Sequence, residues 1–506
     1  MKKSPLLYLI IFSVWVSLIA VTLVPLWIEV QRSEQSGPMI TALVISSTLF
    51  IAYFWLNGTK DIVYTFYYYA RRRSLLKVPP IKIWREEFGD YQPLVLLLHC
   101  ACDDFNGDDL RRSMQQNYAN TKTVILDDSK QAESRAEIDD FARAHNVEVV
   151  RRNNSIGFKA GNLNNFLQQA TFDYFVILDS DEIIPPYFIQ RALDYFARYE
   201  NIGILQANHV ATRNKNNFMN LFAIGVNSHW LTYQAVKHHH GFLSLLGHGA
   251  MISRECYQTA GGFPHLVAED LCFSIEARNK GYYTAFAPDI ICQEEYPVNY
   301  LAFKKRHSKW TQGNMEFIKK YTWRILTSKM SWFEKMDIFL FTYNLPLTAF
   351  FALYVVINVV MLPVLDYNVA YPTWLLVPTI LFLLAPMLND IVYYCKHMNP
   401  LNLVWYLCHT LLLYGSVFFV SLKSSLKSVF NKSVFLVTPK SQRHISRWEA
   451  LTANKGELLF AVMLFAVSTY INHSPLPTLL IIIPAVSSVY LTLISNKSRR
   501  LQKSAS

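Results

Sequence analysis

The chain lacks the cysteine patterns of a disulfide-stabilised or zinc-stabilised fold. Its seven cysteines show no paired disulfide spacing and no C-x-x-C motif, so they predict reduced thiols and favour a cytosolic location for the domain that carries them. Acidic residues are also few: 37 Asp and Glu stand against 48 Lys and Arg, a net charge of +11. This excess indicates a membrane surface or an anionic ligand as partner. The chain shows no internal repeat and no low-complexity segment.

Long apolar runs, by contrast, are abundant. Hydrophobic residues make up 52% of the chain and charged residues 17%, which is too apolar for an ordinary soluble enzyme and too charged for membrane spans alone. Residues 1–28 and 39–56 are each apolar over about the length that crosses a bilayer as a helix. No small-residue cleavage site follows the first run, so we expect an uncleaved span rather than a signal peptide.

Charge bias predicts the orientation of these spans. Arg71, Arg72 and Arg73 follow the second run, so the N-terminus and everything after residue 60 are expected in the cytoplasm. Residues 423–456 hold seven basic residues and one acid, which favours the same side. Five apolar runs lie later in the chain, at 338–365, 373–394, 403–422, 458–472 and 476–494. If all five crossed the membrane, residues 423–456 would lie outside the cytoplasm. We therefore expect 403–422 to lie in the interface or to re-enter, leaving about six spans, with seven as the alternative.

Between the two groups of apolar runs, the pattern changes to that of a folded soluble domain. Short apolar runs alternate there with amphipathic stretches, and the runs predict strands at 94–100, 122–128, 147–152, 174–181 and 202–208. This alternation predicts an α/β domain with a mostly parallel sheet covered by helices. Ligands of such sheets bind beyond the carboxyl ends of the strands.

Two of the predicted strands end in acidic clusters. Asp127 and Asp128 end one, and Asp179 and Asp181 end another. Two carboxylates one residue apart at a strand end suit Mg²⁺ or Mn²⁺, with phosphate oxygens completing the coordination shell. Taken alone, such a triplet is more often a solvated turn or a helix cap. The loop "GFKAGNLNN", about 20 residues earlier, strengthens the metal interpretation, because Lys159 and its flanking glycines are typical of a diphosphate-binding loop.

Two later motifs carry further candidate groups. In "VAEDL", one carboxylate is a candidate general base, although both Glu269 and Asp270 also suit the first turn of a helix. In "KRHSKWTQGN", basic side chains can neutralise a leaving diphosphate and the indole of Trp310 can hold a sugar ring. A basic membrane-proximal anchor explains this second motif equally well. The run His238–His240 is not read as a metal site, because three consecutive histidines cannot all point one way.

In this order, "LDDS", "KAGNLN", the D-x-D triplet, "AED" and "RHSKW" resemble the motifs of membrane-embedded family 2 glycosyltransferases of the cellulose, chitin and hyaluronan synthase type. The resemblance covers roughly residues 90–315. It implies a Rossmann-like GT-A domain in the cytoplasm, inserted in a helical transmembrane bundle with interfacial helices. It further implies that Asp127 and Asp128 lie near the uridine, that Lys159 meets the diphosphate, and that Asp179 and Asp181 bind Mg²⁺ or Mn²⁺.

The same resemblance implies a single inverting displacement. Asp270 is then the general base, Arg306 and Lys309 help to hold the donor diphosphate, and Trp310 supports the acceptor sugar. Lys309 departs from the family's Q-x-x-R-W motif, which has a bidentate arginine at that position.

Two further departures leave the donor sugar and the linkage open. Ala268 replaces the threonine of the family's T-E-D motif. "LLGHG" stands where cellulose synthases carry FFCGS, which makes Gly247 and His248 candidate acceptor-binding residues.

The basic stretch "KSVFLVTPKSQR", residues 432–443, sits among the late apolar runs. Phe435, Val437, Thr438 and Lys440 fit the F-x-V-T-x-K gating loop of cellulose synthases, which closes over the active site. The resemblance therefore implies that Thr438 and Lys440 contact the bound nucleotide. A basic interfacial linker is the alternative.

The implied function is processive polymerisation of a β-linked extracellular polysaccharide from a UDP-sugar, with UDP-glucose as the leading donor. The product would leave through the protein's own channel in a bacterial-type inner or plasma membrane. Non-processive transfer to a membrane lipid or lipid carrier is the enzymatic alternative, and a nucleotide-sugar-binding transporter or scaffold the non-enzymatic one. Expected partners are the donor, the growing polysaccharide, the bilayer and accessory export or regulatory subunits, but no nucleic acid.

The expected domains follow the same reasoning. They are two N-terminal spans (1–59), the GT-A domain with a C-terminal interfacial segment (60–335), two spans (336–395), an interfacial or re-entrant helix with the gating-type loop (396–456), two spans (457–496) and a cytoplasmic tail (497–506) that leaves no room for an appended regulatory domain.

Overall fold

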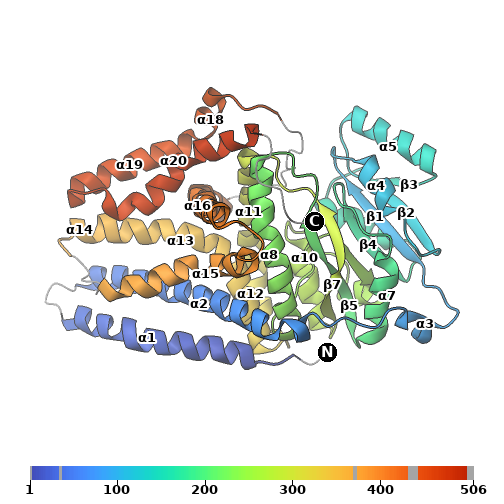
Figure 1. Ribbon diagram of the computed structural model, residues 1–506, viewed down its shortest axis with the longest axis horizontal. Coiled ribbons are helices and arrows are strands. Elements are labelled where there is room, and N and C mark those ends of the chain that lie inside the picture. The colour runs from blue at the N-terminus through green and yellow to red at the C-terminus, as the bar shows by residue number, and fades with distance from the viewer. Residues whose placement is uncertain (1–2, 33–36, 368–372, 431–442, 498–506) are drawn as a thin grey trace.

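The computed structural model describes residues 3–32, 37–367, 373–430 and 443–497. It places a bundle of long helices beside a domain built on one β-sheet (Figure 1). Helices from both ends of the chain contribute to the bundle, so the sheet domain is an insertion between two groups of helices. This is the predicted architecture.

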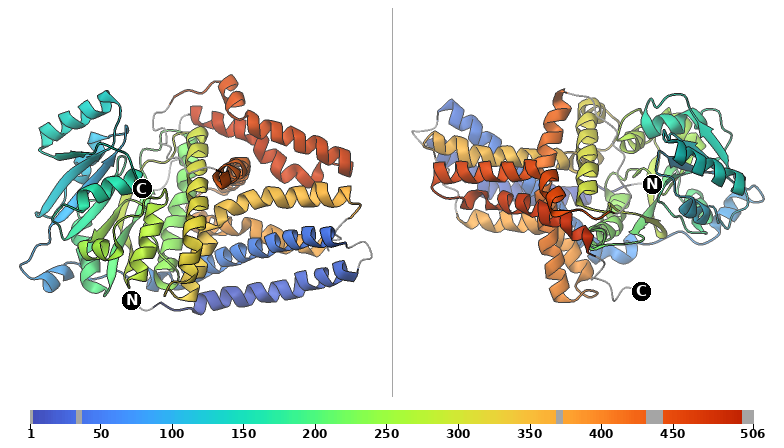
Figure 2. Two further views of the ribbon diagram at one scale, coloured as in Figure 1. Left: turned by 180° about the vertical axis from the view of Figure 1, so that it is seen from behind. Right: turned by 90° about the horizontal axis from the view of Figure 1, so that it is seen from above.

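The bundle helices run alongside one another (Figures 1 and 2). They are α1 (Leu6–Arg32), α2 (Pro38–Leu75), α13 (Asn344–Val356) with its continuations η1 (Ile357–Met361) and α14 (Leu362–Val364), η2 (Thr373–Leu375) with α15 (Leu376–Tyr394), α19 (Lys455–Asn472), and η3 (Leu476–Thr478) with α20 (Leu479–Leu493) and η4 (Ile494–Asn496). Within the described residues, five helices are long and apolar enough to cross a membrane. The number rises to six if α18 (Arg447–Ala453) and α19, which meet at 65°, form one span.

Four helices do not follow the bundle direction. In Figure 2, α16 (Pro400–Ser416) and α17 (Phe418–Phe430) lie crosswise to the bundle helices, at the bundle end that faces the sheet domain. They are one of the five candidates by length and composition. Helices α11 (Tyr300–Leu326) and α12 (Trp332–Thr342) stand between the bundle and the sheet, also crosswise.

Helix α2 extends well past the apolar run that predicted it. The run ends at residue 56, but the helix continues to Leu75. Lys60 and Asp61 lie in this extension and are buried, with Nζ and Oδ1 3.3 Å apart. Their mutual pairing lets the helix bury both charges, so the end of the apolar run does not end the helix.

The sheet has seven strands in the order β3-β2-β1-β4-β6-β5-β7. Their bounds are β1 Val95–Ala101, β2 Thr121–Asp127, β3 Glu148–Arg151, β4 Tyr174–Asp179, β5 Ile202–Ala211, β6 Ala250–Ser253 and β7 Tyr283–Glu294. All five predicted strands are present, and β3, β2, β1 and β4 are parallel neighbours. The short strand β6 pairs antiparallel with both β4 and β5. The sheet is therefore mixed but mostly parallel, as a GT-A fold requires.

Helices cover both faces of the sheet. They are α4 (Gly107–Ser113), α5 (Ala132–His145), α6 (Phe158–Leu167), α7 (Phe188–Arg198), α8 (Asn217–His240), α9 (Arg254–Ala260) and α10 (Glu269–Asn279). One apolar cluster packs α7 against the sheet through Phe188 and Leu193, and another packs α6 and α10 against it through Leu163 and Phe273. Burial of these apolar side chains is the main term that stabilises the domain.

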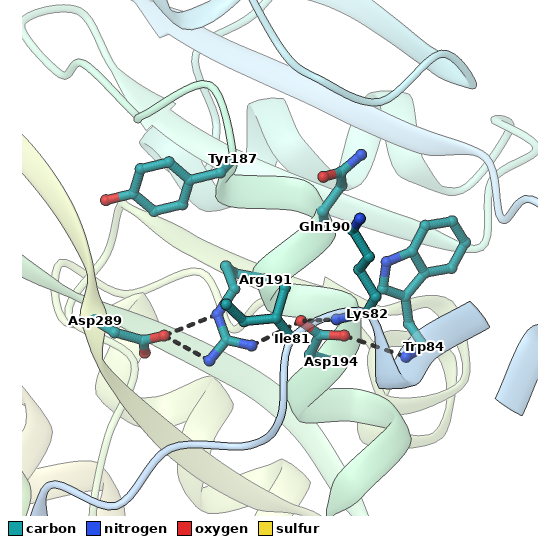
Figure 3. A pocket seen from close by; sticks show the side chains of 8 residues that line it. All are labelled: Ile81, Lys82, Trp84, Tyr187, Gln190, Arg191, Asp194 and Asp289. Atoms are coloured by element: carbon teal, nitrogen blue, oxygen red, sulfur yellow. Dashed lines mark hydrogen bonds and ion pairs between the residues drawn. The ribbon is translucent and has the colours of Figure 1, made fainter. Parts of the chain in front are cut away.

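A buried arginine ties the segment after α2 to the sheet domain (Figure 3). Arg191 donates to Asp289 at 2.6 and 2.8 Å, to Asp194 at 2.7 Å, and to the carbonyls of Pro79 and Pro80. Arg191, Asp194 and Asp289 also line a surface pocket of about 290 Å³ beside α3 (Ile83–Phe88). None of the predicted site residues lines this pocket. Because Arg191 lies away from those residues and connects two parts of the chain, we infer a structural role for it.

We expect Arg191→Met to lower the free energy of unfolding by about 3–5 kcal/mol, because it leaves the buried Asp194 carboxylate without its counter-charge. Arg143→Met is the matched control, since Arg143 pairs with Asp140 in solvent and such pairs contribute about 1 kcal/mol or less. Chemical unfolding of the purified protein in detergent measures both. Equal effects of the two substitutions would contradict the structural role of Arg191.

Candidate active site

The predicted acidic clusters lie at one edge of the sheet. Strands β2 and β4 flank β1 in parallel, with Asp127 opposite Ala101 and Asp179 opposite Cys100. Both aspartates therefore end neighbouring strands at the carboxyl edge. In open parallel sheets this edge is where ligands bind.

Lys159 joins three segments at this edge. It lies in the first turn of α6, and its ammonium group donates to the Asp179 carboxylate and, at 2.8 Å, to the Gly247 carbonyl. Burial lowers the pKa of Lys159, but Asp179 and other neighbouring acids more than offset this and raise the pKa above its usual value. The lysine therefore stays charged at the mouth of the site.

The glycines around Lys159 are required by close packing. A Cβ on Gly157, which has a φ of 74°, would lie 2.7 Å from the His265 ring. A Cβ on Gly161 would lie 1.9 Å from the Ile156 carbonyl oxygen. Side chains at these two positions would displace the loop, and Lys159 with it.

Two arginines that are not among the predicted site residues hold the first acidic motif, Asp127 and Asp128. Asp127 is buried and accepts from Arg151 Nε at 2.6 Å. Asp128 forms a bidentate pair with Arg152, at 2.8 and 2.5 Å. Arg152 also donates to the Ile156 carbonyl at 2.6 Å, so it connects the acidic motif to the lysine loop. In the sequence, these two arginines could have been recognised from the adjacent "RR" at the end of the strand predicted at 147–152.

Glu269 and Asp270 lie together in the first turn of α10. Asp270 accepts from the backbone N–H of Leu271 at 2.7 Å, and its Oδ2 is 3.4 Å from where a Cβ on Gly247 would stand. Burial raises the pKa of Asp270 above its usual value. Burial, and then the charge of Asp270, raise the pKa of Glu269 to about 7. Asp270 is therefore close to the Lys159 loop.

Helix α11 brings the basic motif to the same place. Burial lowers the pKa of Lys309, and the charges of Glu269 and Asp179 offset this only in part, so the side chain lies within electrostatic range of both carboxylates. Arg306 lies over the ring of Trp310, with its Cζ 4.4 Å from the ring centroid, and 38% of Trp310 is exposed. This placement favours a site role for the motif over a plain membrane anchor.

The two residues of the predicted acceptor motif face different neighbours. Gly247 lies beside Asp270, whereas the His248 ring is turned toward Glu182, at 3.2 Å, and Glu294, at 3.6 Å. The acceptor role of His248 stays a prediction, and its side chain is largely enclosed. Thr438 and Lys440 lie outside the described residues, so their contact with a nucleotide also stays a prediction.

Comparison with known proteins agrees with this arrangement. Residues 174–422 match the model of glycosyl transferase family group 2. A probable glucomannan 4-beta-mannosyltransferase of Arabidopsis thaliana is 24% identical over 190 residues, 36% of this chain and 34% of that protein. A beta-monoglucosyldiacylglycerol synthase of Synechocystis is 26% identical over 235 residues, 44% of this chain and 48% of that protein. The match thus spans about a third to a half of these relatives.

Solved structures of similar fold include the mannosyltransferase PcManGT of Pyrobaculum calidifontis in complex with GDP-Man and Mn²⁺. It is 19% identical, with a TM-score of 0.44, and the likeness covers 69% of this chain and 99% of that one. TarS of S. aureus with UDP-GlcNAc is 12% identical, with a TM-score of 0.36, and covers 60% and 93%. Residues 174–422 are thus similar to glycosyl transferase family group 2, in a chain that joins a GT-A-like mixed sheet to a bundle of membrane-type helices.

Proposed function

We propose that the chain is an inverting glycosyltransferase that transfers a hexose from a UDP-sugar to the end of a growing β-linked polysaccharide. The observation that supports this most is the meeting of Lys159, Asp179 and Asp270 at the carboxyl edge of the sheet. A cation for the diphosphate, a carboxylate for the metal and a carboxylate for the acceptor are the groups that such a transfer needs.

The residues at the end of β4 fit a divalent metal ion. Asp179 and Asp181 offer hard oxygen donors at a strand end, and 40% of the Asp179 side chain is accessible. The pairing of the Lys159 ammonium with Asp179 supports the proposal that this carboxylate neutralises a cation. When bound, Mg²⁺ or Mn²⁺ would stabilise the negative charge of the departing diphosphate.

The chain's own side chains have distinct roles in the proposed transfer. Lys159 and Lys309 hold the diphosphate by charge, and Arg306 extends this basic surface along α11. Asp270 removes the proton from the acceptor hydroxyl as that oxygen attacks the anomeric carbon, and the bond to the UDP oxygen breaks in the same displacement. A single displacement turns an α-linked donor into a β-linked product. The exposed face of Trp310 supports the acceptor sugar.

We propose the predicted membrane arrangement as well. The crosswise direction of α16 and α17 (Figure 2) supports an interfacial position for residues 403–422, which places the basic segment 423–456 on the same side as the sheet domain. That side is the cytoplasm by the charge bias of the sequence. The division of the chain at residues 59, 335, 395, 456 and 496 remains part of this proposal.

Transfer to a membrane lipid is the second candidate function. It is favoured by the similarity to the cyanobacterial lipid glucosyltransferase and by an apolar pocket of about 320 Å³ between α2 and α13, lined by Phe50, Tyr53 and Tyr354 among others. Product analysis separates the two functions. We expect a ladder of long glycans from radiolabelled UDP-sugar and protein in lipid nanodiscs. Products that stop at one sugar per lipid would refute polymerisation.

The proposed base predicts a distinctive pH dependence. Burial raises the pKa of Asp270 above the value of about 3.9 that is usual for an aspartate. As the pH is lowered, kcat/KM should therefore begin to fall at a higher pH than an unperturbed aspartate would give. Burial and the charge of Asp270 raise the pKa of Glu269 to about 7, so Glu269 is still protonated where Asp270 ionises. Glu269→Gln resembles the protonated side chain and should leave this limb in place, and Glu269→Asp is the matched control that can still ionise. A limb that Glu269→Gln moves to lower pH would contradict this order of ionisation.

A further inference from the structure

Four ionisable side chains behind the candidate active site form a closed arrangement, which we call the His/Glu ring. Its members are Glu182, His209, His248 and Glu294. Each histidine directs one ring nitrogen to Glu182 and the other to Glu294. His248 lies 3.2 and 3.6 Å from the two carboxylates, and His209 lies 3.7 Å from each. Four segments that are distant in sequence therefore meet here.

The ring is buried, and two of its polar atoms have no hydrogen-bond partner in the described residues. Glu182 and His209 are both 0% exposed. Glu182 Oε2 accepts from the Gly249 N–H at 2.9 Å, but Oε1 accepts no hydrogen bond. His209 Nδ1 is likewise unsatisfied. Glu182 Oε1 faces His209 Nε2, and His209 Nδ1 faces Glu294. Buried polar atoms without partners are costly, so a ligand within the ring would stabilise it.

The spacing of the ring suits a metal ion. Glu182, His209 and His248 each offer one ligand atom, and the three atoms lie within 4.8 Å of one another. Tetrahedral zinc, with bonds of about 2.0–2.2 Å, places its ligands roughly 3.3–3.6 Å apart, which lies within the 4.8 Å limit on the spacing of these three atoms. Gly249 keeps the space open, because a Cβ there would lie 2.3 Å from both Glu182 Oε1 and His209 Nε2.

The charges of the ring favour the same ligand. Two buried carboxylates and two imidazoles make a donor set that zinc prefers when the imidazoles are neutral. One divalent ion balances two carboxylates, whereas a single imidazolium balances only one of them. We propose that the His/Glu ring binds one structural zinc ion.

This zinc site is distinct from the magnesium or manganese site proposed at Asp179 and Asp181. Asp179 ends β4 at the open edge and Asp181 follows two residues later. Glu182, in contrast, contacts His209 of β5 and lies beside His248, which also contacts Glu294 of β7. The zinc would fix the loop that holds Gly247 beside Asp270, and it would reassign His248 from acceptor contact to metal binding. The proposal does not depend on which sugar is transferred.

The test is the metal content of the purified full-length protein. The protein is prepared in detergent with an affinity tag that contains no histidine, washed briefly with EDTA and analysed by mass spectrometry for metals. We expect about one zinc per chain, and Asp181→Asn should keep it. His209→Gln should bind less than a tenth as much, whereas His145→Gln, at the exposed end of α5, should bind as much as the wild type.

A second measurement covers the case in which His209→Gln fails to fold. Wild-type protein grown with cobalt in place of zinc should show the intense visible absorption of tetrahedral Co²⁺. Stripping the metal should lower the melting temperature, and added zinc should restore it. Wild-type protein that holds no stoichiometric transition metal and gains no stability from zinc would overturn the proposal, and would leave a protonated His248 between the two glutamates instead.

Discussion

Asp270→Asn is expected to reduce the rate of sugar transfer about 100- to 10,000-fold, the usual contribution of a positioned general base. The amide cannot accept the proton of the acceptor hydroxyl, but it has nearly the same shape as the carboxylate. Lys159, Asp179 and Lys309 keep their places in this variant. We therefore expect the affinity for UDP-sugar, measured by calorimetry, to change only a few-fold.

Two matched variants make this result specific. Glu255→Gln changes an exposed carboxylate in the first turn of α9, the position that corresponds to Asp270 in α10, and should transfer sugar at the wild-type rate. Glu269→Gln should retain transfer, with the acid limb of the pH profile unchanged. If Asp270→Asn transferred sugar as fast as the wild type, the general base would be another group. If the wild type bound UDP-sugar without turning it over, the chain would be a transporter or scaffold rather than an enzyme.

Removal of divalent metal is expected to have an effect of similar size. Without the metal, charge on the departing diphosphate is stabilised only by Lys159, Lys309 and neighbouring basic groups, so transfer should stop in excess EDTA and return with added Mn²⁺ or Mg²⁺. Asp181→Asn removes one carboxylate ligand. We expect the Mn²⁺ concentration for half-maximal transfer to rise about tenfold or more in this variant.

The matched control for the metal site is Asp108→Asn. Asp108 is an exposed carboxylate in the first turn of α4 that pairs with Arg111, and its loss should leave the metal requirement unchanged. Zinc content is measured on the same EDTA-treated samples, which separates loss of the ion at Asp179 and Asp181 from loss of zinc from the His/Glu ring. Full transfer in excess EDTA, with no metal left in the protein, would refute the metal role.

Much of the sheet could be predicted from local pattern, because its central strands are continuous apolar runs. The buried centres of β1, β2 and β4 are Val95–Leu98, Val124–Leu126 and Phe175–Leu178, and they consist of Leu, Ile, Val and Phe alone. β6, a strand of four residues, was not predicted. β7 escaped because Pro288 and Asp289 interrupt it, at the place where its register with β5 shifts.

The candidate site was predictable only in part, because some of its contacts join segments that are far apart in the sequence. Lys159, Asp179 and Asp270 stand in compact motifs, so their chemistry is visible in the sequence. The partners that hold such groups come from elsewhere in the chain: Arg152 reaches Asp128 across 24 residues, and His248 reaches Glu182 across 66. Contacts at that separation depend on strand order, which local pattern does not determine. The antiparallel β6, which delivers His248, was not predicted at all.

The central claim is that this domain breaks the bond between a nucleoside diphosphate and a sugar and passes the sugar to an acceptor. The most direct test is a panel of UDP-glucose, other UDP-sugars and GDP-mannose, given to the purified protein in nanodiscs with Mn²⁺, with released nucleotide and new glycosidic bonds counted together. The account predicts one preferred UDP-sugar, one UDP released per bond formed, and β-linkage in the product. It would be contradicted if no donor gave transfer above the Asp270→Asn background, or if the product were α-linked.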